Sequence, residues 1–146
     1  MLEEDLATDL REAMRNGDAT RRDTIRQLRA ALHNESIAKG HALADEESVA
    51  VVQRLVNQHR DSISEFKRGK REDLVTKEEA ELEVLLGYLP EQLSREAIAA
   101  AAAAVIEKVG AAGKGDQGRV MRELAPEMRG KADMRIVNEV VQELLG

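Results

Sequence analysis

A helix stop and a new helix start meet in the segment Tyr88-Leu89-Pro90-Glu91-Gln92-Leu93-Ser94. Pro90 has no backbone N–H for a continuing helix and disfavours helical backbone at the preceding residue. Ser94 is a preferred N-cap residue because its hydroxyl can accept from the free N–H groups of a first helical turn. The chain is therefore predicted to divide into residues 1–89, a linker at 90–93, and residues 94–146.

Before this segment, apolar residues recur at helical spacing. Leu2, Leu6 and Leu10 follow one another every four residues, as expected for one face of an amphipathic helix. Thr76 and Glu79 have the spacing of a capping box, with Asp73 as an alternative start for that helix. The predicted helices cover 2–16, 18 or 20 to 39, 45–68 and 76–89.

After the segment, three more helices are predicted. An Ala-rich helix covers 95–109 and is followed by a loop with four glycines between 110 and 118. The sixth helix starts at Asp116 and the last at Asp133, both good N-cap residues. Pro126 falls in the final turns of the sixth helix, where it removes a hydrogen bond and is expected to kink it.

The composition favours helices over sheets. Of the 146 residues 34% are charged, and with one Phe, one Tyr and no Trp any core is aliphatic. We predict an all-α protein, with an N-terminal helical domain of about four helices and a small C-terminal three-helix domain. No segment of the sequence alternates apolar and polar residues over a length typical of a β-strand.

Several classes of protein are excluded by the same composition. Without Cys, disulfide frameworks and thiolate sites are impossible, which suits the reducing cytoplasm that we predict as the location. The longest apolar run, residues 98–106, is far shorter than the roughly 20 residues of a membrane span. Glu3 and Glu4 stand where an export signal would be basic. No membrane partner is expected.

No catalytic set can be assembled from the sequence. The three histidines, His33, His41 and His59, are predicted to be structural or solvated, since no nucleophile accompanies them at motif spacing. Glu78, Glu79, Glu81 and Glu83 are predicted to form the solvated face of their helix rather than a metal site. We therefore expect no catalytic residues, metal or cofactor.

Three of the loop glycines form a G-x-G-x-x-G pattern at Gly113, Gly115 and Gly118. A dinucleotide-binding fingerprint requires a preceding strand, and here a helix precedes it. A weak phosphate contact near the start of the sixth helix remains open, because glycines free the backbone N–H groups there.

Basic side chains could form local patches although the net charge is −6, since residues 72–93 alone contain one basic and seven acidic residues. One stripe, Arg22, Arg26, Arg29 and His33, shares a helix face and is predicted to be solvated or salt-bridged. The second set surrounds the glycine loop and a turn at Gly130. Its six members, which share that stretch with four acidic residues, are Lys114, Arg119, Arg122, Arg129, Lys131 and Arg135. A local excess of two positive charges suits a small RNA-backbone footprint.

Several segments together resemble one protein family. They include Glu78-Glu79-Ala80-Glu81-Leu82, the 88–94 segment, Ser62-Ile63-Ser64-Glu65-Phe66, and Gly130-Lys131-Ala132-Asp133. In order and spacing they resemble the YqeY-like branch of the GatB/YqeY family. The resemblance implies that residues 94–146 are similar to the helical tail of the B subunit of glutamine-dependent aminoacyl-tRNA amidotransferase. That tail helps hold a misacylated tRNA and performs no chemistry.

Three functions follow as hypotheses. The preferred one is a non-catalytic tRNA-binding accessory module whose six basic residues meet the tRNA backbone. The alternative is a helical adaptor with a protein partner. The third is carbon-nitrogen ligase activity with glutamine as amido donor, which the family relation suggests; the ATP- and metal-binding cradle of the B subunit has no counterpart in this sequence. For Arg129, Lys131 and Arg135 we predict an anion site at the last helix N-terminus, with capping by Asp133 as the alternative.

Overall fold

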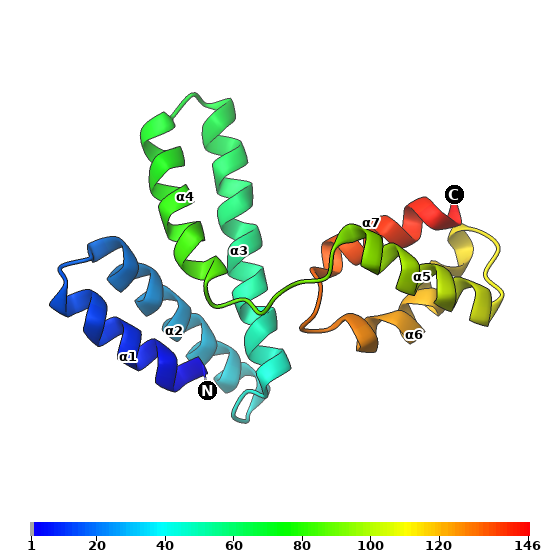
Figure 1. Ribbon diagram of the computed structural model, residues 1–146, viewed down its shortest axis with the longest axis horizontal. Coiled ribbons are helices and arrows are strands. Elements are labelled where there is room, and N and C mark those ends of the chain that lie inside the picture. The colour runs from blue at the N-terminus through cyan, green and yellow to red at the C-terminus, as the bar shows by residue number, and fades with distance from the viewer. Residues whose placement is uncertain (1) are drawn as a thin grey trace. The chain divides into compact units, whose positions relative to one another are not determined.

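The computed structural model describes residues 2–146, over which it contains seven α-helices and one 3₁₀ turn, confirming the all-α prediction (Figure 1). The helices are α1 (Leu2–Arg15), α2 (Ala19–Lys39), α3 (Asp45–Arg68), α4 (Glu72–Leu86), α5 (Arg95–Val109), η1 (Lys114–Asp116), α6 (Gln117–Met128) and α7 (Met134–Leu145). Contacts divide the chain into a first unit that ends at Leu89 and a second unit, Pro90–Gly146.

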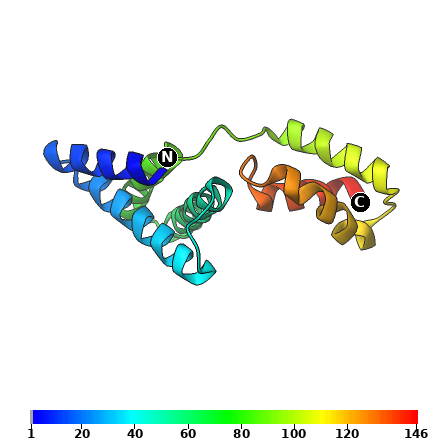
Figure 2. The same ribbon diagram turned by 90° about the horizontal axis from the view of Figure 1, so that it is seen from below.

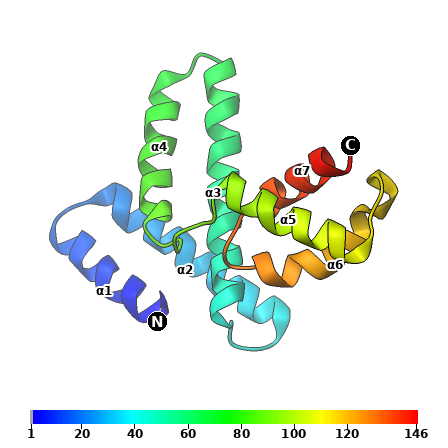
Figure 3. The same cartoon turned by 45° about the vertical axis from the view of Figure 1, so that its right-hand side comes forward.

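The first unit is built from two helical hairpins. α1 packs on α2 and α3 packs on α4, while α2 also contacts both helices of the second hairpin (Figures 1 and 3). Fully buried aliphatic side chains fill the space between them, among them Leu6, Ile25, Leu28, Val52 and Leu85. Burial of this apolar surface is the main term that stabilises the unit.

The ends of α2 show how the sequence sets helix boundaries. The Asp18 carboxylate accepts a hydrogen bond from the backbone N–H of Arg21 at 3.1 Å. At the other end Gly40 adopts a left-handed conformation, with φ +76°, which ends the helix. Both caps confirm the predicted boundaries.

The prediction for α4 was displaced by about one turn at each end. α4 starts at Glu72, close to the alternative start at Asp73, so Thr76 lies inside the helix. The early start buries Val75, whose N–H bonds to the carbonyl of Arg71. After Leu86 the backbone tightens into bonds between residues three apart, such as that from the Leu89 N–H to the carbonyl of Leu86.

The second unit is a three-helix arrangement in which each helix contacts the other two (Figure 2). Its core contains the fully buried Ile98, Val120, Leu124, Val137 and Val141. α6 continues as a helix through Pro126 to Met128. None of the helices in the described residues, 2–146, has the length and apolar character needed to cross a bilayer.

Candidate nucleic-acid interface

All six basic residues predicted for RNA contact are exposed, and α6 divides them into two groups. The loop group, Lys114, Arg119 and Arg122, lies around the start of α6. The turn group, Arg129, Lys131 and Arg135, lies between the end of α6 and the first turn of α7. Arg119 and Arg129 are separated by about 15 Å of helical rise. From the sequence the six residues were predicted to form one cluster, whereas in the structure they form two groups, one at each end of α6.

One member of the loop group, Arg119, belongs to a hydrogen-bond network at the turn between α5 and α6. Asp116 accepts a hydrogen bond from the backbone N–H of Ala112 at 2.9 Å, which lowers the pKa of the Asp116 carboxyl. Arg119 donates to the carbonyl of Val109 at 2.9 Å and lies 3.7 Å from Asp116. Arg119 is therefore partly engaged within the chain. Within residues 2–146, Lys114 and Arg122 make no ion pair.

The glycines of this loop keep its backbone approachable. A Cβ atom added at Gly113, Gly115 or Gly118 would meet no other atom within 4 Å, so packing does not require glycine there. Gly118 lies in the first turn of α6. The G-x-G-x-x-G pattern follows α5 rather than a strand, which confirms that the context of a dinucleotide-binding fold is missing.

Beside the turn group, Asp133 lies at the N-terminus of α7, where an anion site was predicted. Its carboxylate is buried and accepts from the backbone N–H of Arg135 at 2.9 Å, capping α7. The capping that was predicted as the alternative is therefore present, and the anion site at this N-terminus stays a prediction. Arg129 and Lys131 remain exposed, and in the described part of the chain neither forms an ion pair.

One acidic residue near the six basic residues forms an ion pair with a lysine that is not one of the six. Glu123 lies 3.3 Å from the ammonium of Lys108, which belongs to α5. Because this pair is neutral as a whole, Glu123 subtracts less from the positive field of the six residues than the sequence count implied.

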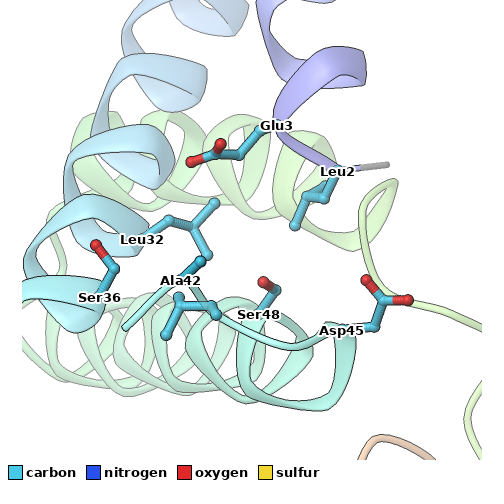
Figure 4. A pocket seen from close by; sticks show the side chains of 8 residues that line it. Leu2, Glu3, Leu32, Ser36, Ala42, Asp45 and Ser48 are labelled. Carbon is cyan, nitrogen blue, oxygen red and sulfur yellow. The ribbon is translucent and has the colours of Figure 1, made fainter. Parts of the chain in front are cut away.

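The basic stripe on α2 agrees with its predicted solvated character. Arg22 pairs with its neighbour Asp23 at 2.8 Å, and Arg26, Arg29 and His33 are exposed. The first unit also contains a hollow of about 360 Å³ between the start of α1, the end of α2 and the start of α3 (Figure 4). Its lining includes Glu3 and Asp45, whose carboxylates disfavour a phosphate.

One group of side chains was missed by the sequence analysis. His59 of α3 meets Glu78 and Glu81 of α4, although the sequence placed both carboxylates on a solvated face. That prediction is wrong for these two residues, because α4 turns the i, i+3 pair toward α3. Glu79 and Glu83 are exposed as predicted, and so are His33 and His41.

Comparisons with known proteins cover nearly the whole chain. The family described as Yqey-like protein matches residues 3–145. The altered inheritance of mitochondria protein 41, mitochondrial, of Pyrenophora tritici-repentis is 33% identical over 147 residues, which cover 97% of this chain and 79% of that protein. The proteins of the same name from Saccharomyces cerevisiae and Lachancea thermotolerans are 38% and 39% identical over 85 residues. Those matches cover 58% of this chain and 46% of each yeast relative.

Proposed function

Because the chain belongs to the YqeY-like family, we propose that it is a non-catalytic accessory module that binds tRNA through the basic residues of its second unit. The resemblance of this unit to the amidotransferase tail supports the proposal, since that tail helps hold tRNA. In this role the chain performs no chemical step. A carbon-nitrogen ligase reaction would belong to an enzyme with which it associates.

The observation that carries the proposal is the exposure of four cations without intramolecular ion pairs. Within residues 2–146 these are Lys114 and Arg122 of the loop group, and Arg129 and Lys131 of the turn group. A cation that is not already paired can contact a phosphate and release its counterion, which favours binding. Contacts of this kind position a nucleic acid without reading its sequence.

The proposed binding mode relies on backbone contacts rather than base stacking. The two aromatic side chains, Phe66 and Tyr88, belong to the first unit, so the second unit offers no aromatic platform for bases. We therefore expect recognition of tRNA shape and phosphate spacing, with a strong dependence on salt.

Filter binding of the full chain to total tRNA at low salt tests the proposal. Two double variants each remove two positive charges: Lys114→Gln with Arg122→Gln, and Arg129→Gln with Lys131→Gln. Each is expected to weaken tRNA binding, with an unchanged circular dichroism spectrum. The matched control, Arg15→Gln with Lys70→Gln, removes two exposed charges from the first unit and should bind as the wild type does.

The outcomes separate the competing functions. If both C-terminal double variants bind tRNA like the wild type, the proposed interface is wrong. If the wild type itself binds no tRNA at low salt, the helical protein-interaction adaptor replaces this proposal. The cytoplasmic location stays a prediction, since the names of the relatives refer to mitochondria.

A further inference from the structure

His59 is surrounded by oxygen atoms from two other helices. Its Nδ1 lies 2.5 Å from Glu78 Oε2 and 3.6 Å from Glu81 Oε2, both on α4. Its Nε2 lies 3.3 Å from Oε1 of Gln27, on α2. The His59 side chain is 7% exposed, against 20% for Glu78 and 19% for Glu81. The imidazole is thus enclosed, and the two carboxylates form its opening toward solvent.

The two carboxylates beside Nδ1 favour a positive charge at this position. A neutral imidazole whose Nε2–H donates to Gln27 presents the lone pair of Nδ1 to two carboxylates, which is repulsive. Among the described residues, 2–146, no Lys or Arg forms an ion pair with Glu78 or Glu81. A proton on Nδ1, which then donates to Glu78, removes this repulsion, and so does a metal ion at Nδ1. Of the two, a divalent ion also balances the charge of both carboxylates.

We propose that His59, Glu78 and Glu81 form a binding site for a divalent transition-metal ion of the Zn²⁺ type. Their ligand atoms all lie within 4.8 Å of one another. One imidazole nitrogen with two carboxylate oxygens is a ligand set that Zn²⁺ accepts, at bond lengths of about 2.0–2.2 Å. Ca²⁺ and Mg²⁺ prefer sites made entirely of oxygen.

The surrounding structure orients these ligands. Glu78 and Glu81 are three residues apart, so one face of α4 presents both carboxylates to α3. Oε1 of Gln27 lies 3.3 Å from Nε2, so in the tautomer with Nε2–H it accepts from that group, as the outer partner of a metal-bound histidine commonly does. This tautomer leaves the lone pair of Nδ1 for the ion. Partial exposure of the carboxylates leaves room for water at the remaining coordination positions.

Calorimetric titration of the tag-free full chain with Zn²⁺ alone tests this site. We expect one ion per chain. Glu78→Gln and Glu81→Gln should each weaken Zn²⁺ binding about tenfold or more, since even the loss of an outer partner has that effect. Glu79→Gln is the matched control on the same helix, because the Glu79 side chain is 55% exposed and lies 3.9 Å from Lys67.

Thermal unfolding gives a second readout. Excess Zn²⁺ should raise the melting temperature of the wild type and of Glu79→Gln equally, and raise that of Glu81→Gln clearly less, because an ion bound only to the folded state stabilises it in proportion to the logarithm of its affinity. The proposal is overturned if millimolar Zn²⁺ does not bind the wild type. It is overturned equally if Glu79→Gln weakens binding as much as Glu81→Gln does. His59→Gln should also abolish binding, and if it unfolds, the two glutamate variants decide.

Discussion

The Tyr88 hydroxyl donates a hydrogen bond to Oδ2 of Asp9 at 2.6 Å. Asp9 lies on α1, whereas Tyr88 follows the end of α4, so this bond joins the two sequence ends of the first unit. Arg21 of α2 lies 3.6 Å from the other oxygen of Asp9 and 3.5 Å from Glu12. Three separate segments therefore meet at one carboxylate, just before the linker at 90–93.

Replacing Tyr88 with Phe should destabilise the first unit by about 1–2 kcal/mol. A hydrogen bond to a charged group contributes about 1.5–3 kcal/mol, and partial exposure of this one reduces its contribution. Urea unfolding of the wild type and of Tyr88→Phe, followed by circular dichroism, measures the difference. A loss below about 0.3 kcal/mol would show that water replaces the hydroxyl without cost.

The same bond predicts a pH dependence on the alkaline side. Burial, and then the hydrogen bond to Asp9, raise the pKa of the Tyr88 phenol above its ordinary value. The unfolded chain then loses this proton at about pH 10, while the folded chain keeps it. The contribution of Tyr88 is therefore fully present below about pH 10 and is lost as the pH rises through the raised pKa. The stability difference between wild type and Tyr88→Phe should shrink as pH increases beyond that point.

Truncation of Leu85 should be costly, because this side chain is fully buried between α4 and its neighbours. We expect Leu85→Ala to lower the free energy of unfolding by about 2–5 kcal/mol, the range for buried leucines. Leu144→Ala is the control, since Leu144 is 46% exposed and should lose far less. Equal losses in the two variants would contradict the packing of α4.

Most helix boundaries could be predicted because local signals and packing agree. The Asp18 and Ser94 side chains both accept from the backbone N–H groups that N-cap chemistry assigns to them. At α4 the signals competed, and burial of Val75 prevailed over the capping-box spacing of Thr76. A local pattern cannot reveal that outcome, since the gain comes from residues distant in sequence.

The candidate sites were less predictable for the same reason. The six basic residues are exposed, as is usual for Lys and Arg, but their division into two groups depends on the length of α6. In the cluster of His59, Glu78 and Glu81, the histidine and Glu78 are 19 residues apart in the sequence. The packing of α3 against α4 brings His59 to Glu78. A spacing rule for residues of a single helix cannot predict such a contact between two helices.

Limited proteolysis of the full chain should first cut near residues 89–91 or in the loop at 110–118. The residues Pro90 and Glu91 are exposed and lie outside helices, whereas Leu93 is tied to the second unit by its N–H bond to the carbonyl of Lys131, at 2.8 Å. Mass spectrometry of early fragments identifies the sites. Early cleavage within residues 50–64 would contradict the packing of α3.

Replacing Gly118 with Ala should stabilise the second unit by about 0.5–1 kcal/mol, because glycine is a poor helix former and the backbone is already helical there. The added Cβ would meet no atom of the chain within 4 Å. A phosphate that approaches the first turn of α6 between Lys114 and Arg122 would meet it. We therefore expect weaker tRNA binding by a more stable protein.

Alanine variants of two other glycines distinguish an effect of backbone strain on tRNA binding from an effect of direct contact with the tRNA. Gly110 has φ +68°, so Gly110→Ala should destabilise the unit by about 1 kcal/mol or more without adding bulk at the start of α6. Gly113 is extended, with φ −167°, and its alanine variant should leave stability nearly unchanged. If Gly118→Ala is stabilised yet binds tRNA like the wild type, the phosphates are held by the basic side chains alone. Weaker binding by Gly118→Ala and unchanged binding by Gly110→Ala would instead mean that the backbone of α6 itself meets the tRNA.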